Sequence, residues 1–480
     1  MRIIPRRLLG HFLCLVLSSL ATAASVHAAT HCVAPGGAYG CVSSISAAIS
    51  ASAAGDVVVI TDGHYAENII IDKSLTLTGI GGGAVIMPAV SNPNPCEGSS
   101  LCGGLASNIV LVQASNVVIR NLTLDGDNPA LTSGVVRDGA DLDARNGIIT
   151  NHTTHIPYNN LIVTNVTVQN IYLRGIYASS GGTFTFDRNT VRNVQGDYAS
   201  IAMFNVGGSG RMTRNTVSKA NDAISSNWSS GVQFLNNTVR QSGSGIHTDN
   251  SGGLGVGTGD VIAGNRIEDG APGAYGIFVF VPYLPVVVRD NRITQVEVGL
   301  SVFGQGQAVT TTFADNSVDG RHAPGTAGVL LTTDELGYGQ TDVAAVFTRN
   351  TISGFENGFV IESDPQRTIA VDASCNDIRN SQGRTLIVGG LASYTDFPGV
   401  PPVGGGTTNL VFSQNNFGRK GLGVENRGLG TLDARNNWWG CDDGPGAKQC
   451  LAVIGSVSFA PWLTHRAECA NRLDSRDPRE

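Results

Sequence analysis

Residues 286–302 read VVVRDNRITQVEVGLSV and contain the pattern that decides the fold. A run of Val is followed by Asn291 and a short alternating stretch, and then by a Gly-Leu pair that starts a second alternating stretch. Alternation at a period of two is typical of β-strands, and the polar and Gly residues between the stretches predict turns. The segment therefore predicts three short strands joined by tight corners.

The same pattern returns along the chain at intervals of about 25 residues, which is the mark of a repeat architecture. Its fixed element is an Asn, one variable residue and then Val or Ile, at Asn165, Asn189, Asn215, Asn237, Asn265, Asn291, Asn316, Asn350 and Asn376, with variants at Asn416 and Asn437. Three strands per repeat make one coil of a parallel β-solenoid, and roughly a dozen coils would stack about 4.8 Å apart. The expected fold is thus all-β: a single-stranded parallel β-helix, with an inserted loop wherever the step is longer, as between Asn316 and Asn350.

The recurring Asn has an architectural explanation. Side-chain amides that stack from coil to coil can form a hydrogen-bonded ladder. Asn also tolerates the left-handed backbone conformation that a tight corner requires. We therefore expect the repeated Asn residues to mark one corner of the helix.

The N-terminal residues 1–28 have the organisation of a secretory signal peptide. Three Arg precede an apolar stretch from Leu8 to Leu20, and Val26-His27-Ala28 fits a cleavage site between small residues. No second apolar run of membrane-spanning length follows. The expected location is therefore secreted or periplasmic, without a membrane association after cleavage.

The cysteines point to the same oxidising compartment. Of nine Cys, Cys14 lies in the signal peptide, which leaves an even number and favours disulfides. Local spacing suggests Cys32–Cys41, Cys96–Cys102 and Cys441–Cys450, and leaves Cys375–Cys469. A structural metal site is the alternative, but no Cys-x-x-Cys or paired His supports it.

Composition and charge exclude several classes of protein. Charged residues make up 14% and the formal charge is −7, which argues against disorder and against a nucleic-acid partner. The 62 Gly have no triplet period, which excludes collagen.

Two terminal segments resemble a known family. Residues 41–79, which contain Asp62-Gly63-His64-Tyr65 and Lys73-Ser74-Leu75-Thr76, resemble the N-terminal segment of right-handed parallel β-helix repeat proteins of the pectate-lyase-like superfamily. Asn436-Asn437-Trp438-Trp439-Gly440, followed by Gly444-Pro445, is similar to the closing motif of that family. The resemblance implies a right-handed helix of coils and a short helix that caps its N-terminal end.

This resemblance divides the mature chain into three parts. Residues 29–86 would form the cap and the first coils, 87–440 the repeats with inserted loops, and 441–480 a C-terminal disulfide cap and tail. The apolar spacing in residues 43–54 fits the capping helix. The first strands would be Val57–Thr61 and Ile69–Ile71.

Candidate functional residues lie on the strands that begin with Gly-Ile or Gly-Leu. If the Ile points inward, the next residue points outward. Outward aromatic rings suit the apolar faces of sugars, and polar groups beside them suit the hydroxyls. The predicted substrate-binding residues are Tyr177, Phe204, Asn227, Trp228, Phe278 and Phe280.

The predicted catalytic residues come from the same coils. His247 and Asp249 are two apart on one strand and face the same side, so His247 could act as acid or base with a carboxylate beside it. Asp222 and Lys219 come from the preceding coil. The structural alternative is that these residues belong to an ordinary strand face, either exposed to solvent or covered by a loop. His247-Thr248-Asp249 differs from the Asn-Thr-Asp motif of polygalacturonases, so that mechanism does not carry over.

Two further charged groups have both a functional and a structural interpretation. Arginines on neighbouring coils could neutralise a uronate carboxylate or could form a solvated stripe: Arg174, Arg188, Arg211, Arg214 and Arg240. An acidic cluster could hold calcium, the one cofactor that the sequence suggests, or could be a polar insertion: Asp125, Asp127, Asp138, Asp141 and Asp143.

Three hypotheses for function result. The first is a monomeric secreted protein that binds an extracellular polysaccharide and processes it as a lyase, hydrolase or epimerase. The second is a non-catalytic surface, adhesion or structural module. The third is a periplasmic metal-handling protein, against which the scarce Met and dispersed His argue.

Overall fold

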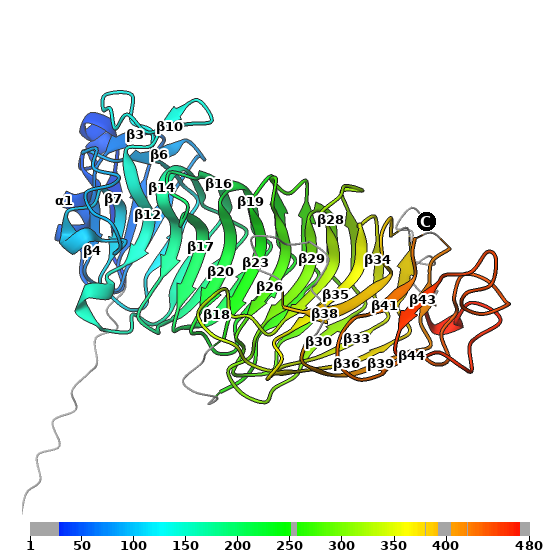
Figure 1. Cartoon of the computed structure of the whole chain (residues 1–480). Coiled ribbons are helices and arrows are strands. Elements are labelled where there is room, and N and C mark those ends of the chain that lie inside the picture. The colour runs from blue at the N-terminus through cyan, green and yellow to red at the C-terminus, as the bar shows by residue number, and fades with distance from the viewer. Residues whose placement is uncertain (1–27, 251–256, 380, 392–404, 420, 471–480) are drawn as a thin grey trace, which may run out of the picture.

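The computed structural model describes residues 28–250, 257–379, 381–391, 405–419 and 421–470. These residues form a parallel β-helix in which consecutive coils stack into a rod, from the blue N-terminal end to the red C-terminal end in Figure 1. Most coils contribute one strand to each of three parallel ladders, as the repeat predicts. The signal peptide and the end of the tail lie outside the described residues.

The first ladder is a 16-stranded sheet and contains the strands that precede the Asn corner. Its strands in order are β1 (Thr30–Val33), β2 (Val57–Ile60), β5 (Thr76–Gly79), β8 (Val118–Arg120), β13 (Leu161–Thr164), β15 (Thr183–Asp187), β18 (Ser209–Thr213), β21 (Gln233–Leu235), β24 (Val261–Ala263), β27 (Val287–Arg289), β30 (Thr311–Ala314), β33 (Val343–Thr348), β36 (Thr368–Ser374), β39 (Thr407–Ser413), β42 (Leu432–Asp433) and β44 (Val457–Ser458). The stack is longer than the expected dozen or so coils, because coils at both ends lack the Asn phrase.

The second and third ladders are joined at one long strand, β14 (Thr167–Ala178), and together make a 26-stranded sheet. The second ladder follows the Asn corner and contains β3 (Gly63–Ala66), β6 (Ala84–Met87), β9 (Thr123–Asp125), the start of β14, β16 (Thr190–Val194), β19 (Thr216–Ala220), β22 (Thr238–Arg240), β25 (Arg266–Glu268), β28 (Arg292–Val296), β31 (Ser317–Gly320), β34 (Thr351–Ser353), β37 (Asp377–Arg379) and β40 (Asn416–Phe417).

The third ladder begins at the Gly-Ile or Gly-Leu step and carries the candidate site. It contains β4 (Ile69–Ile71), β7 (Asn108–Val112), β12 (Ala144–Thr150), the end of β14, β17 (Ile201–Val206), β20 (Asp222–Asn227), β23 (Ser244–Asp249), β26 (Tyr275–Phe280), β29 (Val298–Phe303), β32 (Ala327–Thr332), β35 (Asn357–Ser363), β38 (Leu386–Gly390), β41 (Val424–Asn426) and β43 (Val453–Gly455). A separate antiparallel hairpin is formed by β10 (Val136–Arg137) and β11 (Ala140–Asp141).

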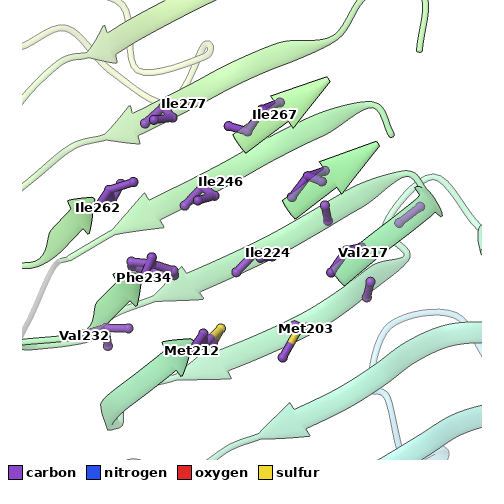
Figure 2. Packing of buried hydrophobic residues seen from close by; sticks show 14 of the residues in the cluster. Met203, Met212, Val217, Ile224, Val232, Phe234, Ile246, Ile262, Ile267 and Ile277 are labelled. Carbon is purple, nitrogen blue, oxygen red and sulfur yellow. The ribbon is translucent and has the colours of Figure 1, made fainter. Parts of the chain in front are cut away.

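The core between the ladders consists of columns of apolar side chains. Figure 2 shows Met203, Ile224, Ile246 and Ile277 from the third ladder facing residues of the other two, and all four are fully buried. Each buried side chain of this size contributes about 1.5–3 kcal/mol relative to an exposed one. Since every coil packs on its neighbours, the stability of the rod is approximately a sum over the interfaces.

The Asn ladder is present and continuous from β16 to the last coils. The amide Nδ2 of Asn189 donates to Oδ1 of Asn215 at 3.1 Å, and the backbone N of Asn189 donates to the same oxygen at 2.9 Å. The same pair of bonds links each further member to the next: Asn215, Asn237, Asn265, Asn291, Asn316, Asn350, Asn376, Asn415 and Asn437.

The ladder corrects two details of the sequence interpretation. Its member in the penultimate coil is Asn415 and not Asn416. The left-handed backbone belongs to the residue before the ladder position, as at Arg188 with φ 55° and Asp290 with φ 57°. Asn165 occupies this preceding position (φ 53°), where its side chain donates to Asn121 at 2.9 Å, and so it lies outside the ladder.

The N-terminal cap is formed by α1 (Ile45–Ala51), within the predicted range of 43–54. The Glu67 carboxylate accepts from the backbone N–H groups of Ile45 and Ser46 at 2.8 and 2.9 Å, and so satisfies the free N-terminus of the helix. Lys73 Nζ donates to the Ile49 carbonyl at the other end, at 3.1 Å. The predicted strands at 57–61 and 69–71 are present as β2 and β4. Sequence reasoning missed β1, which pairs with β2 ahead of the helix.

Short 3-10 turns complete the described secondary structure: η1 (Pro35–Gly40), η2 (Cys102–Gly104) and η3 (His152–Thr154). All four predicted disulfides are present, Cys32–Cys41, Cys96–Cys102, Cys375–Cys469 and Cys441–Cys450, with Cα–Cα distances of 4.9, 5.7, 5.3 and 5.3 Å. Disulfides of this number indicate an extracytoplasmic compartment. Within the described part of the chain, no helix has the length and apolar character needed to span a membrane.

Candidate functional site

The third ladder places His247 at the centre of an outward row. In the register of the parallel strands, Ser225 of β20 lies beside His247 of β23, and His247 lies beside Phe278 of β26. Two residues further along the strands, Asn227 pairs with Asp249. Since the residues between these rows point into the core, both rows face outward as the alternation predicts.

His247 is held by polar groups on one side and an aromatic ring on the other. Its Nδ1 lies 3.1 Å from Ser225 Oγ and 3.8 Å from Asp222 Oδ2, and its ring stacks on Phe278 with centroids 4.6 Å apart. The Ser225 hydroxyl donates to Asn227 Oδ1 at 3.0 Å, so its lone pairs can accept from Nδ1–H. This network assigns the proton to Nδ1 and leaves Nε2 as the acceptor.

The imidazole of His247 is largely buried. Its side chain is 16% exposed, and its Nε2 is buried with no hydrogen-bond partner among the described residues. Asp222 is itself fixed by the hydroxyl of Ser244 in the next coil.

A pocket of about 440 Å³ opens beside this row. Its lining residues are Asn227, Trp228, Asp249, Phe280, Val281, Tyr283, Glu335 and Tyr338. The Phe280 ring connects it to the His247 ring, with centroids 6.4 Å apart. Four predicted site residues, Asn227, Trp228, Asp249 and Phe280, therefore line one cavity. The 440 Å³ volume lies within the roughly 300–1,000 Å³ typical of small-ligand pockets.

The pocket presents aromatic surface to solvent. Trp228 is 65% exposed and Tyr338 is 86% exposed. The backbone at Trp228 and Val281 is left-handed, with φ of 57° and 41°. Such values are uncommon for large and β-branched side chains and concentrate at functional sites.

Tyr177 and Phe204 do not form the exposed sugar-binding surface that the sequence predicts. They stack on each other with centroids 4.7 Å apart, but only 8% and 6% of their surface is exposed. Leu101, in the loop closed by Cys96–Cys102, packs against both rings. A loop inserted between β6 and β7 therefore covers this part of the ladder. The alternation of residues along the strands does not predict that a loop buries these rings.

Arg174 belongs to the covered region. Its guanidinium lies 4.8 Å from the centre of the Phe204 ring, and its Nε donates to Ser100 Oγ at 3.3 Å. Desolvation lowers the pKa of Arg174 to about 10, so that it remains a cation at neutral pH. It therefore contributes charge beneath the loop.

Lys219 lies apart from the His247 cluster. It is on β19 of the second ladder, and its ammonium pairs with the Asp138 carboxylate at 2.6 Å. Arg188 and Arg214 pair with Asp187 at 3.1 and 2.7 Å, which supports the structural interpretation of these two arginines. The predicted grouping of Lys219 with His247 is thus wrong, because Lys219 precedes the bend between the ladders.

The acidic cluster is dispersed rather than focused on one point. Asp125 accepts from Gln169 and Asn170 at 2.6 and 2.7 Å, and Asp143 accepts from the backbone of Asn128 at 3.1 Å. Asp138 is engaged by Lys219. Over the described ranges, no three His, Cys, Asp or Glu side chains are grouped so that they could hold a metal ion. The expected calcium site does not fit these residues, which behave as a polar insertion.

Sequence reasoning missed half of the pocket lining. Tyr338 and Glu335 come from the loop after β32, inside the long step from Asn316 to Asn350 that predicted an insertion. Val281 and Tyr283 follow β26. The long step between Asn316 and Asn350 predicted an inserted loop but not its path. Contacts such as the Phe280–Tyr338 ring pair, with centroids 6.5 Å apart, bring this loop to the pocket.

Residues 146–318 match the family model described as a right handed beta helix region. The chain is a right-handed β-helix protein. The match covers less than half of the sequence, and the parallel ladders extend the same architecture beyond it on both sides. The right-handed parallel β-helix that the sequence resemblance implies is thereby confirmed.

Solved structures with a similar course of the chain have diverse activities. The A-module of a mannuronan C-5 epimerase from Azotobacter vinelandii is 17% identical, with 87% of this β-helix chain and 94% of that chain covered and a TM-score of 0.44. PfbA, a surface adhesin of Streptococcus pneumoniae, is 14% identical, with coverages of 68% and 86% and a TM-score of 0.43. A pectin methylesterase in complex with a hexasaccharide is 15% identical, with coverages of 55% and 78% and a TM-score of 0.34.

Comparison with curated proteins gives no match for this chain. At the identities above, likeness concerns the fold and transfers no activity, because one fold hosts many functions. The function is therefore argued from the pocket.

Proposed function

We propose that this protein binds an extracellular polysaccharide on the outer face of the third ladder and processes it with His247 as the acid–base residue. The observation that carries the proposal is the open aromatic pocket beside His247. Aromatic faces, a carboxylate and an amide in one cavity are the groups that bind sugar rings.

Binding would use both kinds of surface in the pocket. The exposed rings of Trp228 and Tyr338 offer faces for stacking on the C–H faces of a sugar. Asn227 and Asp249 provide acceptors, and Asn227 also a donor, for hydroxyl groups. A long glycan fits a rod-shaped protein, because its further units can follow the coils on either side.

In the proposed chemistry, His247 exchanges a proton with the bound chain at Nε2, which is buried in this structure and has to become accessible when the chain binds. Ser225 is a positioning residue that fixes the ring through Nδ1, and Asp222 stabilises the imidazolium form. The His247 ring is further held by its stack on Phe278. In a hydrolase the proton would go to the glycosidic oxygen. In a lyase or epimerase it would come from the carbon next to a uronate carboxylate, which requires a cation to neutralise that carboxylate.

The proposal is tested with purified mature protein on a panel of polysaccharides. Retention on immobilised glycans measures binding, and reducing ends together with the ultraviolet absorbance of unsaturated uronates measure turnover. We expect retention on at least one glycan, loss of retention in Trp228→Ala, and loss of turnover in His247→Ala. The matched control is His465→Ala, since His465 is exposed near the C-terminal end.

The outcomes separate the two main hypotheses. Full turnover in His247→Ala would contradict the acid–base role. Retention without turnover in the wild type would show a binding module, which is the adhesion alternative. Absence of retention across the whole panel would contradict the polysaccharide proposal itself.

A further inference from the structure

The charge of the pocket favours one class of sugar. Both charged side chains that line it, Asp249 and Glu335, are acidic. Among the described residues, no Lys or Arg lines it. Two of the arginines that the sequence suggested for neutralising a uronate are engaged elsewhere: Arg240 pairs with Glu268 at 3.0 Å on the second ladder, and Arg174 lies against Phe204 beneath the loop.

The aromatic walls act in the same direction as the carboxylates. The face of an aromatic ring is electron-rich and attracts a cation held within about 6 Å of its centre. Trp228 and Tyr338 present such faces to solvent, and the Phe280 ring lies against Tyr338. A positive group in this cavity would therefore be attracted by the rings and by both carboxylates. A uronate would bring its own carboxylate toward Asp249 and Glu335 and would be repelled.

The Glu335 carboxylate and the backbone at Asp249 are held in place before any ligand binds. Glu335 Oε1 accepts from Thr341 Oγ1 at 2.7 Å, and the backbone of Glu335 is bonded to Gly339 and Tyr338 across the tip of the loop, both at 3.0 Å. Asp249 is the last residue of β23, and its carbonyl accepts from the Trp228 backbone at 2.6 Å. Such preorganisation lowers the entropic cost of binding.

We propose that the pocket selects a sugar unit with a free amino group, such as glucosamine in a polysaccharide. This inference rests on the proposed polysaccharide binding and specifies its substrate class. The protonated amine would lie between the carboxylates of Asp249 and Glu335, while the sugar ring stacks on Trp228 or Tyr338. A chain built only of such units contains no uronate, so the chemistry at His247 would be hydrolysis: water adds to the anomeric carbon, the glycosidic C–O bond breaks, and His247 gives its proton to the leaving oxygen.

The test compares three oligosaccharides of equal length by calorimetry: a glucosamine oligomer, its N-acetylated form and a galacturonate oligomer. We expect the glucosamine oligomer to bind about tenfold more tightly than the N-acetylated one, since the amine adds interactions worth about one power of ten in Kd. The preference should weaken as salt is added. Quenching of Trp228 fluorescence, absent in Trp228→Phe, would locate the ligand in the pocket.

The carboxylates are tested by Glu335→Gln and Asp249→Asn. Each should reduce the preference for the free amine over the N-acetylated form about threefold to fivefold. Glu468→Gln is the matched control, since Glu468 is exposed at the far C-terminal end of the described chain. Circular dichroism would confirm that each variant keeps its fold.

Several outcomes would overturn the inference. Galacturonate binding as tightly as glucosamine would refute it and leave the proposed polysaccharide binding intact. Equal affinity for the free and acetylated amines would do the same. Failure of all three oligomers to bind would refute it as well, and retention on another glycan of the panel would then show whether the broader proposal survives.

Discussion

Two aromatic regions lie on the same ladder of this protein and have opposite fates. In the closed region, Tyr177 and Phe204 stack beneath the loop of Cys96–Cys102. In the open region, Trp228 and Tyr338 project into solvent around a cavity. The repeat supplies Tyr177 and Phe204 in the closed region and Phe280 in the open region, whereas Tyr338 comes from an inserted loop. Inserted loops decide which rings become core and which become a binding surface.

The two regions are also anchored by opposite charges. Arg145 is 2% exposed and clamps the covering loop by donating to the carbonyls of Ser100 and Pro93 at 3.0 and 2.9 Å. Asp260 is fully buried below the open region, where it accepts from Thr248 Oγ1 at 2.6 Å and from the Val232 backbone at 2.8 Å. Each buried charge is satisfied by hydrogen bonds from neutral groups, which makes each anchor sensitive to substitution.

The largest expected effect is on the free energy of unfolding, which substitutions in the closed and the open region should change to different extents. Phe204→Ala should lower the free energy of unfolding by about 3–5 kcal/mol, because it leaves a cavity under Leu101. Tyr338→Ala should change it by less than about 0.5 kcal/mol, since that ring is exposed. Guanidinium unfolding followed by circular dichroism measures both. Similar losses in the two variants would show that the regions do not differ in burial.

The contribution of Asp260, the buried anchor of the open region, to the free energy of unfolding should depend on pH. Burial raises the pKa of Asp260 to about 6, from an ordinary value of 3.8. Between these pH values the folded state binds more protons than the unfolded state, so this group's contribution to stability falls as pH rises from about 4 to about 6. The loss would reach about 3 kcal/mol at neutral pH.

Unfolding of the wild type and of Asp260→Asn across this pH range tests the assignment. The difference between the two proteins isolates Asp260 from carboxylates with lowered pKa values, such as Asp187, whose slope has the opposite sign. For Asp187, burial opposes the lowering, and hydrogen bonds from Thr213 and Arg214 outweigh it. A pH-independent difference between wild type and variant would contradict the raised pKa.

The closed region's anchor should give a smaller effect. Arg145→Met keeps the side-chain volume but leaves the buried carbonyls of Ser100 and Pro93 without their donors, at a cost of about 2 kcal/mol. We expect faster proteolysis within residues 93–105 and unchanged ligand binding in the open pocket. Arg435→Met is the control, because Arg435 is an exposed arginine paired with Asp433. Equal protease resistance in the two variants would argue against the clamp.

The smallest change in free energy is expected for ligand binding. Trp228→Ala should weaken glycan binding about tenfold, or about 1.4 kcal/mol, through the loss of one stacking face. Tyr177→Ala should leave affinity unchanged in whatever fraction of the protein remains folded. Calorimetry on both variants measures this, and a larger loss of affinity from Tyr177→Ala would reverse the roles of the two regions.

The sequence by itself determined the periodic part of this protein. The Asn ladder, the inward Ile columns and the outward positions of His247 and Asp249 follow from the repeat, because a β-strand alternates its side chains and each coil repeats the last. Three disulfides follow from the short spacing of their cysteines, and Cys375–Cys469 is the pair that then remains. The left-handed corner was placed one residue too late, at the ladder Asn instead of the residue before it, and Asn165 and Asn416 were wrongly assigned to the ladder.

Tertiary structure decided everything that depends on insertions between coils. Leu101 covers Tyr177 and Phe204, Glu335 and Tyr338 complete the pocket, and Lys219 turns to Asp138 instead of His247. No periodic signal encodes these contacts. The path of an inserted loop is set by anchors distant in sequence, such as Arg145 with the carbonyls of Pro93 and Ser100, which form only once the coils have stacked.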